Sequence, residues 1–373
     1  MLVYIWQDDD WPKFRWDAET LLAPLSEARY KQGRLLGQME RLGFDLRREA
    51  SFQATVEDVI RTSEIEGEKL DPTRVRSSVA RRLGLPDVGL TPPDRQVEGV
   101  VDMMLDAMQN SAKPLSAERL FAWHAALFPT GFSGLRKSIV GSWRTDYDGP
   151  MQVVSGPLGR QKTHYEALPA RRITAEMKRF LAGFNDSKPV DGLLQSSLVH
   201  LWFVTIHPFE DGNGCIARAI ADLALARTEG TGQRFYSVSA QIQRERSLYH
   251  DVLERTQKGT LDVTEWLVWF MSCFSHAIDT AEKDCRSVLR KAEFWQRFAE
   301  EPLSARQKTI LNRFMDDFKG NLTVRKWATL GKCSVDTANR DLNDLVARGL
   351  LVRNPGGSKR TSYSVPGIEA GVP

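Results

Sequence analysis

The sequence predicts a mainly α-helical protein with one small β-hairpin and a separate C-terminal unit of three helices and a second hairpin. Three observations indicate this fold class. Apolar residues recur at helical spacing along most of the first 300 residues. Residues 138–155 instead carry two β-prone runs around a turn. Beyond about residue 303 the chain becomes basic, and its residue pattern changes to three short helices followed by a hairpin.

The helices can be placed by their start and stop signals. Pro92 and Pro93 break the chain before one helix, and Pro114 with Ser116 precedes the next. We expect one helix to begin within Trp16–Leu22 and another to run from Phe52 to Glu66. Further helices are expected at 94–109, 117–128, 174–184, 193–207, 215–228 and 245–256. A long amphipathic helical stretch should cover 263–300.

The β-prone runs are Ser138–Arg144 and Met151–Ser155, and Asp146–Pro150 between them has turn chemistry. This pattern predicts a hairpin inside an otherwise helical region. The chain then divides into an N-terminal helical region (1–100), a helical core with the hairpin and a long connecting helix (101–300), and a C-terminal domain (301–373).

In the C-terminal domain, the sequence predicts three helices, at Ser304–Phe318, Val324–Leu330 and Ser334–Arg348. A hairpin should follow, with strands Leu350–Arg353 and Arg360–Val365 joined by a turn at Asn354–Ser358. This order is similar to a winged helix-turn-helix. Its third helix would present Asp336, Thr337, Asn339, Arg340 and Asn343 outward and Leu342, Leu345 and Val346 inward.

Net charge is only +3, but it is unevenly placed. Residues 303–373 hold 12 lysines and arginines against 6 acidic residues, whereas the preceding residues hold 39 against 42. The basic tail favours an anionic partner, and we expect duplex DNA to contact 334–360, including Arg353, Lys359 and Arg360. A protein-interaction or dimerisation module of the same shape is the alternative, and a homodimer stays open.

Composition is that of a soluble globular protein. The N-terminus lacks the features of a signal peptide, and the longest apolar runs are shorter than a membrane span. The four cysteines form no C-x-x-C pair, so neither a disulfide framework nor a zinc site is indicated. We expect a cytoplasmic protein without membrane contact.

One segment, His207–Arg218, indicates a chemistry. An apolar helix ends before it and a second helix begins near Asn213, so Gly212, Asn213 and Gly214 lie at a helix N-terminus, where free N–H groups attract anions. His207 and Asp211 flank this cradle, which predicts a phosphate-transfer centre. A plain helical corner with Gly and Asn as turn residues is the alternative.

The same segment resembles the signature of the Fic family, H-P-F-x-[DE]-G-N-G-R-x-x-R. It matches at His207, Pro208, Phe209, Asp211, Gly212, Asn213, Gly214 and Arg218. It departs at Cys215, where the family has its first arginine. This difference indicates natural drift or an engineered change at a supporting phosphate contact. The alternative is a redox-sensitive thiol whose pKa the helix dipole lowers.

A second family motif, [ST]-x-x-x-E-[GN], matches at Thr62, Glu66 and Gly67. Gly67 can serve as the left-handed residue that ends a helix, which puts Glu66 at the helix C-terminus. The resemblance implies that Glu66 pairs with Arg218 and inhibits the enzyme. A solvated surface glutamate is the alternative.

Tyr4–Trp6, Gln152–Pro157 and the C-terminal unit recur in one subgroup of long bacterial Fic proteins, so the resemblance covers nearly the whole chain. It implies a helical Fic core with a small β-hairpin flap and a winged helix-turn-helix domain. It also implies a protein adenylyltransferase, which transfers AMP from ATP to a Ser, Thr or Tyr hydroxyl of a protein and releases pyrophosphate.

The resemblance also implies the role of each site residue. His207 would be the base, which suits an imidazole at neutral pH, and Asp211 would hold Mg²⁺ as a hard oxygen ligand. Backbone N–H groups of Gly212, Asn213 and Gly214, with the Asn213 amide, would stabilise phosphate charge. Arg218 would bind the β- and γ-phosphates and Cys215 would lie beside them. Phe209 would anchor the loop.

The hairpin residues Met151–Ser155 would hold the target protein by strand addition, with self-modification as a further outcome. Val154 and Ser155 are expected at the nucleotide, and Tyr249, His250 and Gln257 would form the nucleoside pocket. Two competing interpretations stay open. One is AMP removal at the same site, with Glu66 positioning a water. The other is a DNA-binding regulator whose Fic centre is degenerate at Cys215.

Overall fold

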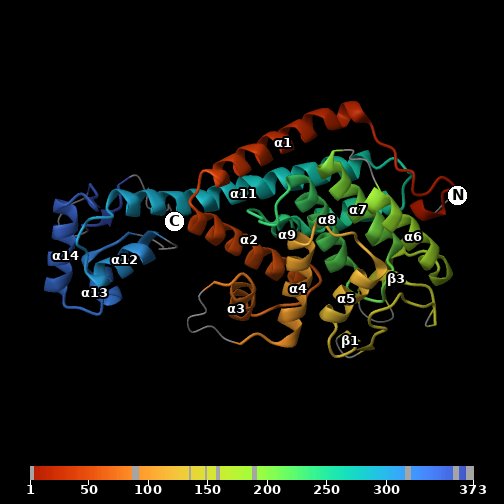
Figure 1. Ribbon diagram of the computed structural model, residues 1–373, viewed down its shortest axis with the longest axis horizontal. Helices are drawn as coiled ribbons and strands as arrows, with labels where there is room; N and C mark the ends of the chain where they lie inside the picture. Colours follow the sequence, from red (N-terminus) through yellow and green to blue (C-terminus); the bar gives the residue numbers. More distant parts are fainter. Residues whose placement is uncertain are drawn as a thin grey trace. The chain divides into compact units, whose positions relative to one another are not determined.

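The computed structural model describes residues 4–85, 92–133, 136–147, 149–156, 160–186, 191–315, 321–355 and 361–366. The chain forms two compact units, Met1–Ala281 and Glu282–Pro373. The first is mainly helical, as expected, with two short antiparallel strand pairs (Figure 1).

The elements of the first unit are η1 (Ile5–Gln7), α1 (Ala18–Glu40), α2 (Phe44–Ile65), α3 (Pro72–Arg82), α4 (Arg95–Gln109), α5 (Ala117–Leu127), β1 (Phe132–Ser133), β2 (Arg136–Lys137), β3 (Gln152–Ser155), β4 (Lys162–Glu166), α6 (Ala170–Asp186), α7 (Gly192–Ile206), α8 (Asn213–Glu229), α9 (Val238–Arg244), α10 (Arg246–Gln257) and α11 (Thr264–Arg297). The last residues of α11 belong to the second unit.

Side-chain caps explain why several helices begin where the sequence predicts. Asp94 accepts a hydrogen bond from the backbone N–H of Val97 at 2.9 Å, and Ser116 accepts one from Arg119 at 3.2 Å. Each cap satisfies an N–H group that has no partner within its own helix. α4 and α5 therefore start directly after the two proline breaks.

α7 and α8 form the centre of the first unit (Figure 1). α8 is buried along nearly its whole length, from Cys215 to Ala226. The two helices approach closely: Ser196 donates to the Ala221 carbonyl at 2.9 Å, and a Cβ on Gly192 would overlap Thr228. Because α8 carries the phosphate-cradle motif at its first turn, that motif is anchored in the best-packed part of the unit.

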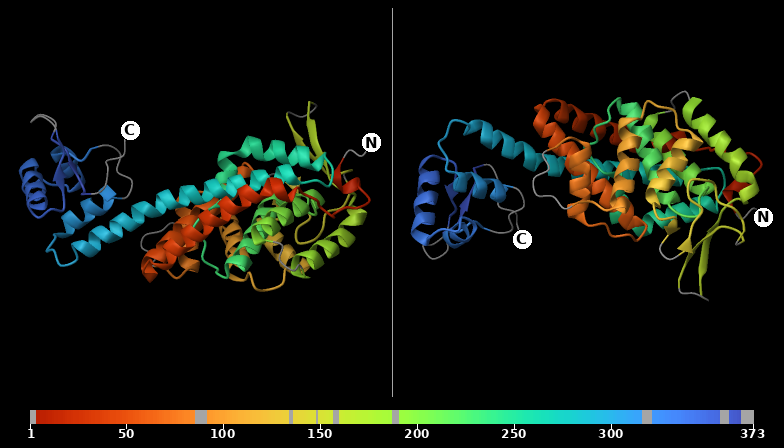
Figure 2. Two further views of the ribbon diagram at one scale, coloured as in Figure 1. Left: turned by 90° about the horizontal axis from the view of Figure 1, so that it is seen from above. Right: turned by 60° about the horizontal axis from the view of Figure 1, so that its bottom comes forward.

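The β-hairpin differs from the prediction. β3 pairs with β4, not with residues 138–144, and a bulge interrupts the register between Val153 and Val154. The segment 138–144 is irregular because its polar groups bind the loop after α7: the Ile139 N–H donates to Glu210 at 3.0 Å, and the Arg144 N–H donates to the Pro208 carbonyl at 2.9 Å. Figure 2 shows β3 and β4 extending away from the helices.

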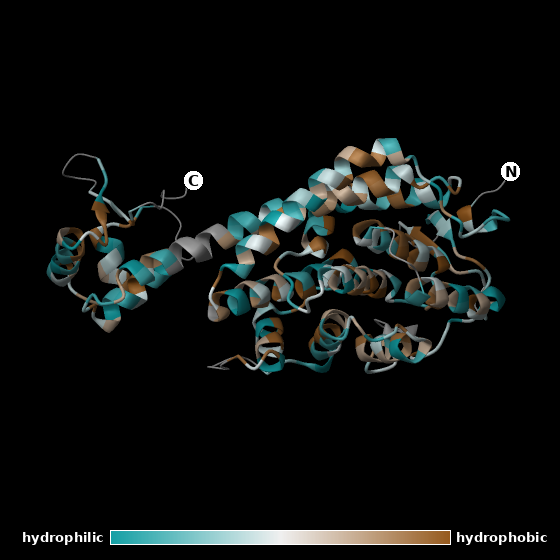
Figure 3. Ribbon diagram, turned by 45° about the horizontal axis from the view of Figure 1, so that its top comes forward, coloured by the Kyte–Doolittle hydropathy of each residue, from teal (hydrophilic) through white to brown (hydrophobic). Residues whose placement is uncertain are grey.

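α1 runs alongside the first part of α11 (Figures 1 and 2). The Asp17 N–H donates to Thr264 at 2.9 Å, and Lys31 pairs with Asp279 at 2.8 Å, so the two helices run in the same direction. Both carry hydrophobic and hydrophilic residues side by side (Figure 3). Among the described helices, none is both long and apolar enough to cross a membrane.

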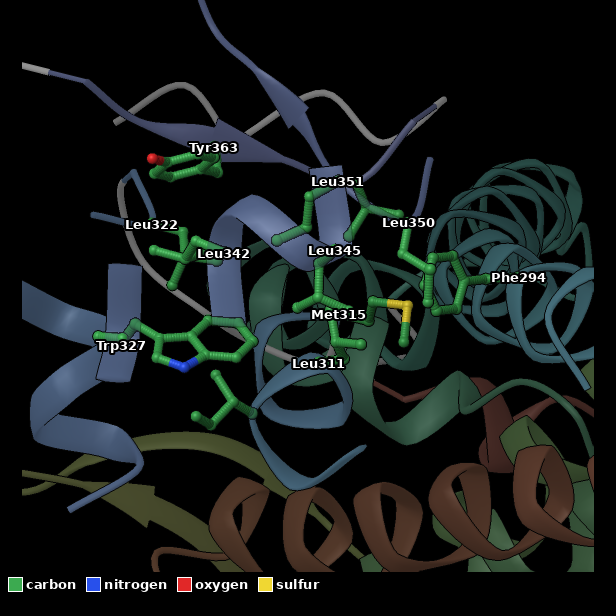
Figure 4. Close-up of a cluster of buried hydrophobic side chains, with 13 residues drawn as sticks. Phe294, Leu311, Met315, Leu322, Trp327, Leu342, Leu345, Leu350, Leu351 and Tyr363 are labelled. Carbon is green, nitrogen blue, oxygen red and sulfur yellow. The ribbon is translucent and has the colours of Figure 1, made fainter. Parts of the chain in front are cut away.

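The second unit contains α12 (Ala305–Met315), α13 (Val324–Leu330), α14 (Val335–Ala347), β5 (Val352–Arg353) and β6 (Tyr363–Ser364). β5 and β6 are antiparallel, and Leu322 bridges Tyr363. The order of three helices and a hairpin is the one expected from the sequence. Trp327 is fully buried in the core of this unit (Figure 4) and donates to Asp341 at 3.0 Å. Lys359 and Arg360 lie outside the described residues.

The contact between α4 and α5 supports a stability prediction. A Cβ on Gly99 would lie 1.8 Å from the Ala126 carbonyl oxygen, so Gly99→Ala has to push the helices apart. We expect it to destabilise the protein by about 2 kcal/mol, as overpacked cores do. The matched control is Gly33→Ala in α1. No atom of the described residues lies within 4 Å of that added methyl, and better helix propensity should stabilise by about 0.5–1 kcal/mol. Urea unfolding measures both, and equal midpoints would contradict the close-approach argument.

Candidate active site

His207 ends α7 in a left-handed backbone conformation, with φ 52° and ψ 59°. Its Nδ1 lies 3.2 Å from the Val204 carbonyl. Because a carbonyl only accepts hydrogen bonds, Nδ1 carries the hydrogen and Nε2 keeps the lone pair. Burial lowers the pKa of His207 to about 4, and the charge of Arg144 acts in the same direction. The imidazole is therefore neutral at neutral pH and able to accept a proton through Nε2.

The loop after His207 is fixed from both sides. The buried Arg144 guanidinium donates to the His207 carbonyl at 2.7 Å and to the Leu168 carbonyl at 2.6 Å. The buried ring of His124 stacks on Phe209, with 4.2 Å between the ring centroids, and its Nε2 lies 3.3 Å from the Asp211 carbonyl. These two residues hold the strained conformation of the loop. Neither residue was predicted from the sequence, and Arg144 lies in a run whose pattern predicts a strand.

The phosphate cradle forms at the start of α8, as expected. Gly212 is left-handed with φ 75°, and a Cβ there would lie 2.9 Å from the Phe128 ring. The Asn213 side chain also closes the loop. Its Oδ1 accepts from the Phe209 N–H at 3.0 Å, and one of the two Nδ2 hydrogens is donated to the Phe209 carbonyl at 2.9 Å. The expected role of the Asn213 amide at a phosphate stays a prediction.

Glu66 reaches this cradle from α2. It is the C-cap residue of that helix, and Gly67 follows with φ 88°, as the motif predicts. Its carboxylate accepts a hydrogen bond from Arg218 at 2.7 Å. A Cβ on Gly214 would lie 2.2 Å from Glu66 Oε1, so the carboxylate lies directly against the first turn of α8. A negative charge of the chain itself therefore already lies where an anion is expected to bind.

Arg218 is 2% exposed and is held by α2 in several ways. Besides Glu66, it donates to the Thr62 hydroxyl at 2.7 Å and to the Thr62 carbonyl at 2.9 Å. Burial works to lower the pKa of Arg218, but the charge of Glu66 raises it above the ordinary value. The guanidinium is thus a permanent cation whose counterion is Glu66.

Asp211 is exposed beside the cradle, and its Oδ1 accepts the Gly212 N–H at 2.7 Å. Glu68 lies near it: burial raises the pKa of Glu68, and the charges of Asp211 and Glu66 raise it further. Among the described residues, no group of three or more histidines, cysteines and acidic residues forms a metal cage. One exposed carboxylate at a phosphate cradle still fits Mg²⁺, which binds through one or two carboxylates together with substrate phosphates.

The expected nucleoside residues lie on α10. Tyr249 is buried, with its hydroxyl 3.1 Å from His200 Nε2, and burial raises its pKa to about 12. Gln257 is also buried and donates to the Thr205 hydroxyl at 3.3 Å. The pKa of His250 is lowered, first by burial and also by the charges of Arg246 and Arg218. Val154 and Ser155 are exposed on β3.

The fold and the site define a helical domain with an anion cradle, a neutral histidine and an opposing glutamate. Residues 114–225 match the Fic/DOC family, and residues 4–85 match a domain of unknown function, DUF4172. The chain therefore carries a Fic/DOC family domain, which includes the whole His207–Arg218 segment. No curated protein matches the chain.

Two solved structures have the same fold. A Fic family protein from Desulfovibrio desulfuricans G20 is 19% identical with a TM-score of 0.57, and the match covers 95% of this chain and 98% of that one. A Fic domain containing signaling protein from Bacteroides thetaiotaomicron VPI-5482 is 16% identical with a TM-score of 0.52, covering 70% of this chain and 98% of that one.

Cys215 does not have the environment of a reactive thiol. It is 7% exposed beneath α2, with Sγ 3.7 Å from the Thr62 carbonyl and 3.5 Å from an Arg218 nitrogen. Burial raises the pKa of Cys215 to about 12, although the charge of Arg218 works against this. The expectation that the helix dipole lowers this pKa is therefore wrong, because loss of solvent outweighs the dipole.

This burial predicts the pattern of alkylation. At neutral pH we expect iodoacetamide to modify the half-buried Cys333 first and to leave Cys215 unmodified, because only an accessible thiolate reacts. Peptide mass spectrometry measures each site, and the chain unfolded in denaturant serves as the control in which all four cysteines react. Modification of Cys215 at a rate equal to that of Cys333 would contradict this expectation and support a redox-sensitive thiol at Cys215.

Proposed function

We propose that this protein is an adenylyltransferase that moves AMP from ATP to a hydroxyl of a protein and that holds itself inactive through Glu66. The observation that carries the proposal is the Glu66 carboxylate lying against Gly214 and paired with Arg218. A helix N-terminus is a site for phosphate, so a carboxylate of the same chain that lies there has to be displaced before a phosphate binds. The Fic/DOC family domain supports the reaction class.

In the proposed reaction, a target hydroxyl attacks the α-phosphorus of ATP and pyrophosphate leaves. His207 takes the hydroxyl proton on Nε2, since Nδ1 is engaged with Val204. Backbone N–H groups of Asn213 and Gly214 stabilise charge on the phosphate oxygens, whereas the Gly212 N–H donates to Asp211. Arg218 binds the terminal phosphates. Asp211 would hold Mg²⁺, which supplies charge neutralisation at the phosphates when it is bound.

The target protein is proposed to add a strand to the flap. β3 and β4 form a two-stranded sheet within the described residues, and Val153 and Val154 are 39% and 40% exposed. An open strand edge with exposed apolar side chains suits strand addition by an extended peptide. This docking would bring the target hydroxyl to the flap side of the site.

Glu66→Gly tests the inhibition. The substitution removes the charge that occupies the cradle and frees Arg218 for phosphates, so AMP transfer from labelled ATP should rise at least about tenfold, or about 1.4 kcal/mol of barrier. Glu64→Gln is the matched control, because Glu64 lies on the same helix but pairs with Arg61.

A Glu66→Gly/His207→Ala chain should bind ATP and transfer no AMP, since the imidazole acts on the incoming hydroxyl. Equal or lower transfer by Glu66→Gly would contradict autoinhibition. If the variant instead loses the ability to remove AMP from a modified protein, Glu66 serves the reverse reaction by positioning a water. If neither reaction occurs, the centre is degenerate and the chain is a regulator.

We propose that the second unit is a winged helix-turn-helix domain that binds duplex DNA. On α14, Asp336, Arg340 and Asn343 are exposed, whereas Leu342 and Leu345 are buried. The acidic residues of α14 are partly neutralised: Asp341 accepts two hydrogen bonds from Arg306, at 2.9 and 3.0 Å, and Asp344 pairs with Arg348. Arg340 and the basic wing residue Arg353 are then available for an anionic partner.

DNA binding should be strongly dependent on salt. With about two phosphate contacts, affinity for duplex DNA should fall about tenfold between about 50 and 200 mM salt. Arg340→Ala should weaken binding by about 1–3 kcal/mol if it reads a base, whereas Lys13→Ala, an exposed lysine paired with Asp10 in the first unit, should have no effect. Fluorescence anisotropy measures all three chains. Absence of binding at low salt would identify the unit as a protein-contact module.

A further inference from the structure

Three side chains on the β3–β4 hairpin and α10 form a hydrogen-bonded series that includes Ser155, one of the residues expected at the nucleotide. The Ser155 hydroxyl lies 2.5 Å from His164 Nε2, and His164 Nδ1 lies 2.5 Å from a Glu254 carboxylate oxygen. The other Glu254 oxygen accepts from Lys258 at 2.7 Å. A serine, an imidazole and a carboxylate in this order are the elements of an activated nucleophile.

The β-bulge explains how these side chains come together. Val153 pairs with Tyr165 but Val154 pairs with Thr163, so His164 is the extra residue on β4. A bulge re-aims the side chain of its extra residue. His164 therefore reaches Ser155 on the neighbouring strand and Glu254 on α10 at once. A regular register would pair His164 with Val154.

The direction of the hydrogen bonds follows from the charge of Glu254. Burial works to raise the pKa of Glu254, but the hydrogen bonds from Lys258 and His164 lower it to about 2. An ionised carboxylate only accepts, so His164 donates from Nδ1. In the neutral ring with this tautomer, Nε2 accepts the hydroxyl hydrogen of Ser155. The imidazole is thus oriented to take the proton of Ser155 when the oxygen attacks an electrophile.

The series borders the nucleotide residues. Glu254 lies on α10 one turn after His250, and the charges of both His164 and Arg218 act on the pKa of His250, which burial lowers first. Ser155 itself is exposed on β3, the strand proposed to meet target hydroxyls. An activated hydroxyl of the chain therefore lies on the side of the site from which an acceptor is expected.

We propose that Ser155 is an acceptor of AMP in this chain's own modification and that His164, oriented by Glu254, is its base. The inference rests on the proposed transfer from ATP. The Ser155 oxygen forms a bond to the α-phosphorus, the bond from that phosphorus to the bridging oxygen breaks, and pyrophosphate leaves. The hydroxyl proton passes to His164 Nε2. The product is a phosphodiester of AMP on Ser155, on the strand that would receive the target.

The experiment uses the full chain with Glu66→Gly, ATP and Mg²⁺, and locates AMP by peptide mass spectrometry. We expect AMP on Ser155. Adding His164→Gln should reduce the modification of Ser155 at least about tenfold relative to all other AMP-bearing residues, as loss of a general base does. His276→Gln is the matched control: it removes another histidine paired with a glutamate, at 2.9 Å from Glu245, and should leave the modification of Ser155 unchanged.

AMP on other residues or other proteins but not on Ser155 would overturn this inference and leave the proposed function standing. Absence of AMP from every protein would overturn the proposed function as well. If His164→Gln lowers all sites equally, His164 only braces the flap and is not a base. A fluorophosphonate probe on the unsubstituted chain tests the nucleophile without ATP: it should label Ser155, and an unlabelled Ser155 in the folded protein would overturn the proposal.

Discussion

The ion pair between Glu66 and Arg218 is the interaction on which the arrangement of the active site depends. Arg218 is 2% exposed, and a buried guanidinium needs a counterion. α2 supplies it, together with the hydroxyl and carbonyl of Thr62. Leaving a buried charge without its partner costs about 3–5 kcal/mol. Whatever displaces Glu66 must therefore bring negative charge of its own, which a nucleotide phosphate does.

α2 is fixed to the centre of the unit by a second buried polar group. Asp58 on α2 accepts a hydrogen bond from Ser237 at 2.5 Å, and Asp222 on α8 pairs with Arg234 at 2.7 Å. Burial and the nearby charge of Asp58 raise the pKa of Asp222 well above its ordinary value. Asp58 lies two turns before Glu66 on α2. The body of the helix is therefore held in place while Glu66, at its end, faces the cradle.

Local sequence signals indicate part of this site. The glycines and the histidine predicted the start of α8 and Gly67 predicted the end of α2, whereas the pairing of Glu66 with Arg218 was implied by the resemblance to the Fic family. Features that depend on tertiary contacts could not be predicted. Burial, not the helix dipole, decides the pKa of Cys215, and the Asn213 side chain bonds to the Phe209 backbone and closes the loop. β4 replaced residues 138–144 as the partner of β3 because Arg144 is required at the His207 loop. The series from Ser155 to Glu254 depends on the contact of His164 with Glu254, 90 positions further along the chain, and on a bulge that no periodicity reveals.

The place of Glu66 at the very end of α2 sets how fast the site can open. Helix termini move within nanoseconds to microseconds, whereas a residue in the middle of α2 could move only if the helix detached from its neighbours. The free-energy cost of moving Glu66 is then the loss of its ion pair with the buried Arg218. Gly67, left-handed at φ 88°, is a natural pivot for such a motion. Motion of the last turn of α2 is therefore separate from the stability of the fold, because Glu66 and Gly67 can move while the remaining turns of the helix stay packed in the core.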